Sequence, residues 1–281
     1  MIKYLIFGDG FIGNKFKEYF NNIGEESIIV KDRINTTKDI WIHIIKYKPE
    51  IIINAIGKTG RPNVDWCEIH KDETFFSNVT VPTLLAEVCT DTKIRIIHIG
   101  SGCIYEGNKQ FTEEDKPNFK DSFYSRTKIF SEQILNTYDN NILQLRIRMP
   151  IDNKPSDRNL ITKLVRYKEV IADIPNSITY LPDLMLISKE LMDRKESGIY
   201  NVVNSGVITH RELLEMYKWY VDPTYQLPKF IELEELEKLV VARRSNCTLS
   251  TNKLEQKGIT IKNVRNVLKD CMEEYRKWKT Y

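Results

Sequence analysis

The stretch Tyr4-Leu5-Ile6-Phe7-Gly8-Asp9-Gly10-Phe11-Ile12-Gly13 joins four apolar residues to a GxGxxG pattern. The apolar residues predict a buried β-strand, and the glycines predict a tight turn into a helix that starts near Phe11. Backbone amides at such a helix N-terminus can hold a pyrophosphate through Gly8, Gly10, Phe11, Ile12 and Gly13. Because the pattern follows the first strand, it favours dinucleotide binding over a purely structural glycine turn.

The residues after the second predicted strand select the dinucleotide. They read Val30-Lys31-Asp32-Arg33. An acidic residue alone would accept the ribose 2′-hydroxyl of NAD, whereas Lys31 and Arg33 can pair with the 2′-phosphate of NADP. The prediction is therefore NADPH (NADP), with NADH as the alternative cofactor and solvated turn cations as the alternative reading of Lys31 and Arg33.

Outward from this motif, short β-branched runs alternate with segments of helical period. The runs lie at 4–7, 27–30, 51–56, 95–99 and 142–147, and the helical segments at 11–20, 41–47, 82–89 and 124–138. This βαβ rhythm predicts an α/β fold of the Rossmann type, with a doubly wound parallel sheet. Nine of the twelve glycines lie between Gly8 and Gly107, mainly after strands, where such sheets bind ligands.

The rhythm changes after residue 150, which predicts two parts. Residues 1–150 would form the NADP-binding Rossmann domain, and residues 151–281 would form mainly a smaller, mostly helical substrate-binding lobe. Two later strand candidates, near 177–181 and 199–203, are expected to rejoin the sheet.

Composition limits the class of partner. Among 281 residues, 42 Lys and Arg balance 39 Asp and Glu to give a net charge of +3, which argues against nucleic-acid binding through a basic face. No apolar run is long enough to span a membrane, so we expect no membrane partner and a cytoplasmic location, the host cytoplasm if the source is viral. Five scattered cysteines without a CxxC pair favour neither disulfides nor a metal site.

A tyrosine followed four residues later by a lysine is the candidate proton donor. On one helix face, the lysine ammonium would lie near the phenol and lower its pKa. Four pairs have this spacing, but those that begin at Tyr105, Tyr225 and Tyr275 fall in a turn, across a proline and at the C-terminal end. Only Tyr124 and Lys128 open a long helical segment inside the nucleotide domain, and Ser101, after the strand at 95–99, can hold a carbonyl beside them.

Together these residues resemble the extended short-chain dehydrogenase/reductases. The string NAIGKTGRPNVDWCE at 54–68 narrows the resemblance to the nucleotide-rhamnose synthase family of plants and giant viruses, an epimerase/reductase. Bacterial dTDP-4-dehydrorhamnose reductases are more distant relatives. The similarity covers nearly the whole chain, with two departures: the glycine loop at 8–13 is one residue shorter than the usual GxxGxxG, and Arg243 replaces an expected proline.

The resemblance implies a bifunctional 3,5-epimerase/4-reductase that converts UDP-4-keto-6-deoxy-D-glucose to UDP-L-rhamnose. Proton transfer at C3 and C5 needs two further groups, and the family's candidates correspond to Cys103 and Lys163. Without the resemblance, Cys103 is more simply a small buried side chain and Lys163 a solvated one. The resemblance also implies that Asn54, Ala55, Gly57, Tyr124 and Lys128 contact the cofactor.

The implied nucleotide-sugar substrate would contact a further set of residues: Arg61, Asn63, Ser101, Asn159, Arg244 and Asn246. A homodimer is expected, as is a functional link to a UDP-glucose 4,6-dehydratase that makes the 4-keto substrate. Two other functions stay open. One is a dTDP- or UDP-4-dehydrorhamnose reductase without epimerase activity, and the other is an inactive, nucleotide-binding regulatory subunit.

Overall fold

A parallel sheet of six strands, in the order β10-β6-β4-β3-β1-β2, forms the centre of the computed structural model. The structure describes residues 2–138, 141–167 and 170–278. The strands are β1 (Tyr4–Phe7), β2 (Ser27–Val30), β3 (Ile51–Asn54), β4 (Arg95–Ser101), β6 (Ile142–Ile147) and β10 (Gly198–Asn201). Because β2 and β3 lie on opposite sides of β1, the sheet is doubly wound, and the predicted Rossmann-type α/β class is confirmed.

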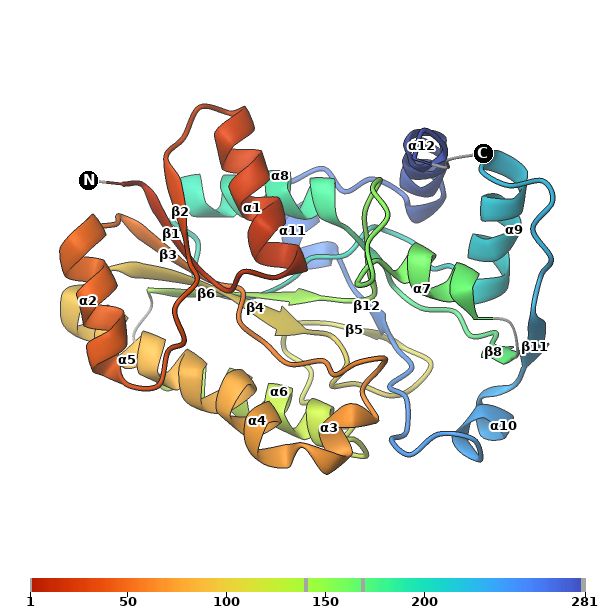
Figure 1. Cartoon of the computed structure of the whole chain (residues 1–281), viewed down its shortest axis with the longest axis horizontal. Coiled ribbons are helices and arrows are strands. Elements are labelled where there is room, and N and C mark those ends of the chain that lie inside the picture. The colour runs from red at the N-terminus through yellow and green to blue at the C-terminus, as the bar shows by residue number, and fades with distance from the viewer. Residues whose placement is uncertain (1, 139–140, 168–169, 279–281) are drawn as a thin grey trace.

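Helices cover both faces of this sheet (Figure 1). One face carries α1 (Phe11–Asn22) and α8 (Leu181–Asp193), and the other carries α2 (Thr37–Tyr47), α5 (Val81–Thr92) and α6 (Phe123–Leu135). Successive residues of β1 point to opposite faces: Tyr4 and Ile6 pack in the core under α1, and Leu5 and Phe7 in the core under α2. Burial on both faces explains why these strands read as continuous apolar runs.

A second apolar core lies beyond the sheet, at the right of Figure 1. It is formed mainly by α7 (Leu160–Arg166), α9 (His210–Tyr220) and α12 (Val264–Arg276). In α12, residues at helical spacing are buried while the other face is charged, and Asn263 caps the helix by accepting from the Arg265 amide at 3.0 Å. Two short ladders border this core: β7 (Pro150–Ile151) with β9 (Thr179–Tyr180), and β8 (Val170–Ala172) with β11 (Lys229–Ile231). The short α10 (Leu233–Glu237) follows β11.

The later chain returns to the first part more than once. β10 lies beside β6 in the sheet, α11 (Asn252–Gln256) contacts β10, and β12 (Thr248–Leu249) pairs with β5 (Gln110–Phe111). The strand expected near 177–181 does not join the sheet, and this expectation is wrong. Only Thr179–Tyr180 are extended, and they pair with β7 because α8 begins at Leu181 with Pro182 in its first turn.

The segment between β3 and α5 is more helical than its sequence suggests. It contains α3 (Trp66–Ile69), α4 (Lys71–Phe75) and the π-helical turn η1 (Phe76–Thr80), which runs directly into α5. Asn78 in η1 is buried, and its side chain donates to Thr127 Oγ1 of α6 at 3.0 Å. Across the ranges that the structure describes, no helix is both long and apolar enough to cross a membrane.

Candidate active site

The glycine loop brings β1, β3 and α1 into close contact. A Cβ on Gly13 would lie 1.9 Å from the Gly8 carbonyl oxygen, and a Cβ on Gly8 would lie 2.6 Å from the Ala55 carbonyl carbon. Gly8 also has φ +114°, which disfavours other residues. A Cβ on Gly10 would meet nothing within 4 Å. Gly10 precedes α1, and the first turn of α1 has no acidic residue that would offset the positive end of the helix dipole.

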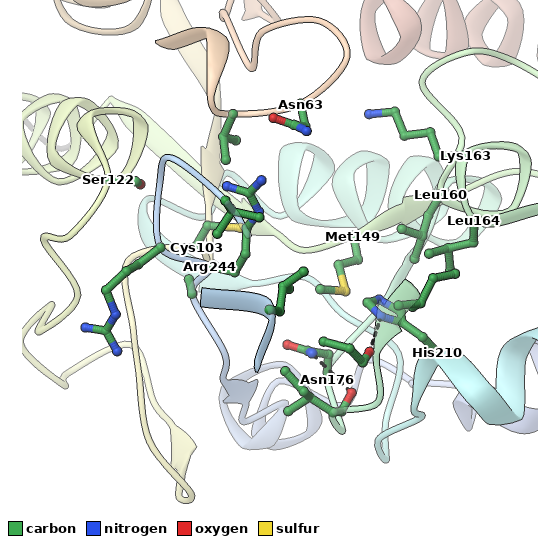
Figure 2. A pocket seen from close by; sticks show the side chains of 18 of the residues that line it. Asn63, Cys103, Ser122, Met149, Leu160, Lys163, Leu164, Asn176, His210 and Arg244 are labelled. Carbon is green, nitrogen blue, oxygen red and sulfur yellow. Dashed lines mark hydrogen bonds between the residues drawn. The ribbon is translucent and has the colours of Figure 1, made fainter. Parts of the chain in front are cut away.

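A cavity of about 340 Å³ lies between the carboxyl end of the sheet and the second core, and Figure 2 shows the side chains around it. Polar lining residues include Cys103, Tyr124 and Lys163. Its other end is mainly apolar, with Leu160, Leu164 and His210 across from Cys103 in Figure 2. A concave site with an apolar wall and a few polar groups is typical of small-molecule binding.

Of the predicted group Ser101, Tyr124 and Lys128, Tyr124 is the member that lines this cavity in the described part of the chain. The Tyr124 hydroxyl donates to Ser101 Oγ at 3.4 Å, and the Cys103 amide donates to the same oxygen at 3.1 Å. Lys128 lies one turn after Tyr124 in α6 and donates to the Ile99 carbonyl at 3.1 Å. All three side chains are buried. Ser101 and Tyr124 are thus brought together, whereas the Lys128 ammonium is bonded to the backbone of β4 and not to the Tyr124 hydroxyl.

The start of α6 is fixed by its own sequence. Ser122 accepts from the Ser125 amide at 3.1 Å, which caps the helix, and the Ser125 hydroxyl donates to the Cys103 carbonyl at 2.6 Å. Glu68 of α3 accepts from the Phe123 amide at 2.6 Å. These bonds hold Tyr124 against the loop that follows β4.

Burial dominates the titration of this group. The pKa of Tyr124 is raised, mainly because its hydroxyl is buried and also because negative charge on Cys103 would oppose it. The expectation that Lys128 lowers the tyrosine pKa is therefore wrong for the protein alone: Lys128 points its ammonium at the Ile99 carbonyl. Burial also lowers the pKa of Lys128 to about 8. Tyr124 is consequently a protonated hydroxyl, able to donate.

Cys103 and Lys163 both line the cavity, as the resemblance implied. Cys103 is partly buried, whereas the other four cysteines are buried, and all five are free. Lys163 projects from α7 toward the side of the cavity that carries Asn63 (Figure 2). Its pKa is lowered, first by burial and second by the positive charge of Arg158. Its amine can therefore lose a proton more easily than an exposed lysine.

The chain matches the RmlD substrate binding domain model over residues 3–277. It belongs to this family. The chain is 42% identical over 262 residues to the Arabidopsis thaliana bifunctional dTDP-4-dehydrorhamnose 3,5-epimerase/dTDP-4-dehydrorhamnose reductase, covering 90% of this chain and 86% of that relative. An Arabidopsis trifunctional UDP-glucose 4,6-dehydratase/UDP-4-keto-6-deoxy-D-glucose 3,5-epimerase/UDP-4-keto-L-rhamnose-reductase is 41% identical, and the match spans 40% of that longer protein and 91% of this chain.

Solved structures agree with this assignment. The crystal structure of a UDP-rhamnose synthase from Acanthamoeba polyphaga mimivirus superposes with a TM-score of 0.91 at 30% identity, covering 97% of this chain and 99% of that one. A dTDP-4-dehydrorhamnose reductase from Clostridium acetobutylicum, at 19% identity, has the same fold with a TM-score of 0.83, covering 98% of each chain. The resemblance to the rhamnose-synthase relatives is confirmed.

In this RmlD-family chain the predicted cofactor residues other than Tyr124 and Lys128, which lie in α6, are near the glycine loop. Gly8, Lys31 and Arg33 line a second cavity of about 410 Å³. Ala55 contacts the loop closely at Gly8, and Gly57 lies two residues further on. Asn54 is fully buried, and its side chain bonds to His98 Nδ1 at 3.0 Å and the Ile56 amide at 3.1 Å. Asn54 therefore shapes the turn after β3, and its side chain is used within the protein.

The predicted substrate residues are more dispersed. Asn63 and Arg244 line the cavity that contains Cys103 and Lys163. The other predicted substrate residues are not among its lining residues in the described part of the chain: Arg61, Ser101, Asn159 and Asn246. Asn159 is fully buried: it caps α7 through the Ile161 amide at 3.1 Å and donates to the Asp152 and Lys154 carbonyls. Its amide groups are thus used within the protein, which gives it a structural position.

Sequence reasoning missed three residues of this site. Asp65 pairs with Arg244 through two bonds of 2.7 and 3.0 Å, so the predicted phosphate-binding arginine already has a carboxylate partner. His210 lines the apolar end, and Arg148 contacts Cys103. Of these three residues, only Arg148 could have been noticed in the sequence, because a charged residue directly after a strand that is buried on both faces is unusual.

Proposed function

We propose that the chain is a bifunctional 3,5-epimerase/4-reductase that converts UDP-4-keto-6-deoxy-D-glucose to UDP-L-rhamnose with NADPH. One observation carries the proposal: Tyr124, bonded to Ser101, lines the same cavity as Cys103 and Lys163. A hydroxyl pair suits reduction of a carbonyl, and two further proton carriers suit inversion at the neighbouring carbons. The name of the plant relative contains both activities, and the mimivirus relative is named a UDP-rhamnose synthase, which supports the same product.

The residues around the glycine loop fit NADPH. Gly8 and Gly13 allow the turn to approach closely, and the open space at Gly10 lies at the N-terminus of α1, where a pyrophosphate binds well. The cavity of about 410 Å³ beside this loop is lined by Lys31 and Arg33, which suit a 2′-phosphate. A dTDP-4-dehydrorhamnose reductase of the same fold from Bacillus anthracis was solved with NADP. NADPH would supply the hydride that reduces C4.

For reduction, Ser101 and Tyr124 would bind the carbonyl oxygen at C4. Ser101 Oγ accepts from Tyr124 and from the Cys103 amide, and no described residue accepts its own hydroxyl hydrogen, which is left for the substrate. Tyr124, held in its protonated form by burial, would give the final proton to O4. Lys128 would hold the nicotinamide ribose and supply positive charge as Tyr124 loses its proton.

For epimerisation, hydrogens at C3 and C5 are acidic because both carbons neighbour the C4 carbonyl. The Ser101 and Tyr124 hydroxyls would stabilise the enolate oxygen, while Cys103 and Lys163 take and return protons. Because Lys163 is half-buried and its pKa is lowered, its ammonium gives up a proton more easily than that of an exposed lysine. Cys103 and Lys163 come from the loop after β4 and from α7, so they approach the sugar from different elements.

Arg244 and Asn63, at the cavity wall, would bind the nucleotide sugar, with Arg244 oriented by Asp65 toward the diphosphate. Arg61 and Asn246 would contribute only after a change in the loops that carry them. A 4,6-dehydratase would supply the substrate, in keeping with the trifunctional plant relative that contains such an activity.

The test is incubation with NADPH and enzymatically prepared UDP-4-keto-6-deoxyglucose, with NADPH absorbance followed and the sugar identified by NMR. UDP-L-rhamnose is expected. A 6-deoxy sugar with unchanged C3 and C5 would reduce the function to a 4-reductase. Binding of NADPH without any consumption would support the regulatory-subunit alternative. The dTDP-linked substrate, run in parallel, identifies the preferred nucleotide.

Replacing Lys31 and Arg33 together by alanine should change the cofactor preference. Each cation can form charge-assisted bonds to the 2′-phosphate, so the Kd for NADPH should rise about tenfold to a hundredfold, while that for NADH stays unchanged. Fluorescence titration with both cofactors measures this. Lys38→Ala, an exposed lysine of α2, is the matched control. An equal loss for both cofactors would contradict the 2′-phosphate assignment.

The pH dependence of reduction should follow Lys128. Burial lowers the pKa of Lys128 to about 8, so its ammonium is present below this pH and lost above it. We expect kcat/KM for reduction, which reports the free enzyme, to fall as the pH rises through about 8. Lys128→Arg should move this fall to higher pH. If kcat/KM of Lys128→Arg fell at the same pH as that of the wild type, the fall would belong to another group.

A further inference from the structure

Arg148 is a buried arginine at the wall of the cavity. It is 1% exposed and lies between β6 and β7. Its Nε donates to Asn176 Oδ1 at 3.1 Å, Nη2 donates to the same oxygen and to the Ser245 carbonyl at 2.8 Å, and Nη1 donates to Ser245 Oγ at 3.2 Å. Nη1 also donates to Cys103 Sγ at 3.2 Å. Four bonds thus fix the guanidinium against the cysteine.

Within the described ranges, the charge of this guanidinium is not balanced by a carboxylate. Among the described residues no Asp or Glu lies within ion-pair distance of Arg148, and the oxygens it contacts belong to an amide, a carbonyl and a hydroxyl. Arg146, two residues earlier, is equally buried but pairs with Glu132 at 2.7 and 2.8 Å. A buried, permanently charged group needs a compensating anion. In the cavity, the atom that can become negative and already contacts Arg148 is Cys103 Sγ.

The backbone at Arg148 is also held firmly in place. Its amide donates to Thr179 Oγ1 at 3.0 Å and its carbonyl accepts from the Thr179 amide at 2.7 Å. Met149, the next residue, has φ +42°, in the left-handed region that a side chain disfavours. Such strain persists where the surroundings enforce it, which is common at functional sites.

We infer that Arg148 is a positioning residue that orients Cys103 and stabilises its thiolate, so that Cys103 enters the epimerisation as the base. This inference rests on the proposed function. In the step it supports, the C–H bond next to the carbonyl breaks, the proton goes to Cys103 Sγ, and the electron pair forms an enolate at C4–O4. The negative charge passes from the sulfur to O4, where Ser101 and Tyr124 donate. Nothing is oxidised or reduced.

Other groups also face Cys103. Tyr124 and Lys128 of α6 interact electrostatically with its sulfur, as does Cys247, next to β12. Tyr124 and Cys247 are neutral when protonated and would oppose a thiolate when ionised. Lys128 is the second cation near the sulfur, and its ammonium is bonded to the Ile99 carbonyl. Arg148 is therefore the cation that donates directly to Sγ.

The test measures the thiol without sugar or cofactor. Because the other four cysteines are buried, iodoacetamide should label Cys103 selectively in the folded protein, as Cys103→Ser will verify by mass spectrometry. At neutral pH, Arg148→Gln should slow this labelling about tenfold, since only the thiolate reacts. Arg148→Lys keeps the positive charge but not the several N–H donors of the guanidinium, so its labelling rate should lie between those of the wild type and Arg148→Gln. Arg166→Gln, at an exposed arginine of α7, is the control for lost charge and should label at the wild-type rate.

An unchanged labelling rate in folded Arg148→Gln would overturn the inference. If that variant does not fold, ultraviolet absorbance of the thiolate is the alternative measurement. The difference between the spectra of the wild type and Cys103→Ser at neutral pH should contain the thiolate band, and its absence would also overturn the inference. The two proposals can fail separately. Slow labelling in Arg148→Gln without rhamnose formation by the wild type would refute the epimerase function alone, whereas rhamnose formation with unchanged labelling would refute the role of Arg148 alone.

Discussion

Tyr124→Phe is expected to lower kcat for reduction of the 4-keto sugar by about 10²- to 10⁴-fold, the usual contribution of a positioned proton donor. The change removes the hydroxyl that donates to Ser101 Oγ and lines the cavity, so O4 would lose both a hydrogen bond and its proton source. Stopped-flow measurement of NADPH oxidation gives kcat, and fluorescence titration should show that the variant still binds NADPH.

Tyr225→Phe is the matched control. Tyr225 also has a lysine four residues later, but its hydroxyl is buried without a hydrogen-bond partner in the described ranges. Its removal should leave kcat unchanged. If Tyr124→Phe also reduced the sugar at the wild-type rate, another group would be the proton donor, and the assignment of the serine–tyrosine–lysine group would be wrong.

Cys103→Ala and Lys163→Ala should each reduce rhamnose formation at least about a hundredfold, because each removes a proton carrier for C3 or C5. Neither residue lines the cavity beside the glycine loop, so NADPH binding should persist. In D₂O, the wild type should place deuterium at both C3 and C5. Because inversion of a carbon needs a base on one ring face and an acid on the other, each variant should lose inversion at both carbons. NMR of the recovered sugar separates the two positions.

Cys89→Ala controls for removal of a cysteine outside the cavity, since Cys89 is buried in α5. If Cys103→Ala and Lys163→Ala both formed rhamnose at the wild-type rate, inversion would need other residues, and the shared cavity would no longer explain two reactions.

Much of the fold could be predicted because burial on both faces leaves a strong pattern. All four residues of β1 are buried, and the glycine loop follows directly, so a short window identified strand, turn and helix. The strand expected at 177–181 failed because Pro182 fits the first turn of a helix as well as it ends a strand. The helices at 66–80 depend on tertiary contacts such as Asn78 with Thr127, which leave no periodic signal.

Fewer features of the site than of the fold could be predicted from the sequence. Tyr124 and Lys128 could be chosen by their place in a helix, whereas Cys103 and Lys163 were identified only through the resemblance. Which polar groups are already used within the protein cannot be read from a sequence. The side chain of Asn159 caps α7, and that of Arg244 forms an ion pair with Asp65, 179 residues earlier. Arg148 likewise could be assigned a role only from its surroundings in the structure, where no described carboxylate pairs with it and Cys103 Sγ accepts from it.

The central claim is that one cavity performs inversion at two carbons and reduction at a third. Its most direct test is a single incubation of the wild type with NADPH and UDP-4-keto-6-deoxyglucose in D₂O, followed by NMR of the product. We predict UDP-L-rhamnose with deuterium at both C3 and C5. A reduced 6-deoxy sugar that keeps its original configuration and carries hydrogen at both carbons would contradict the claim.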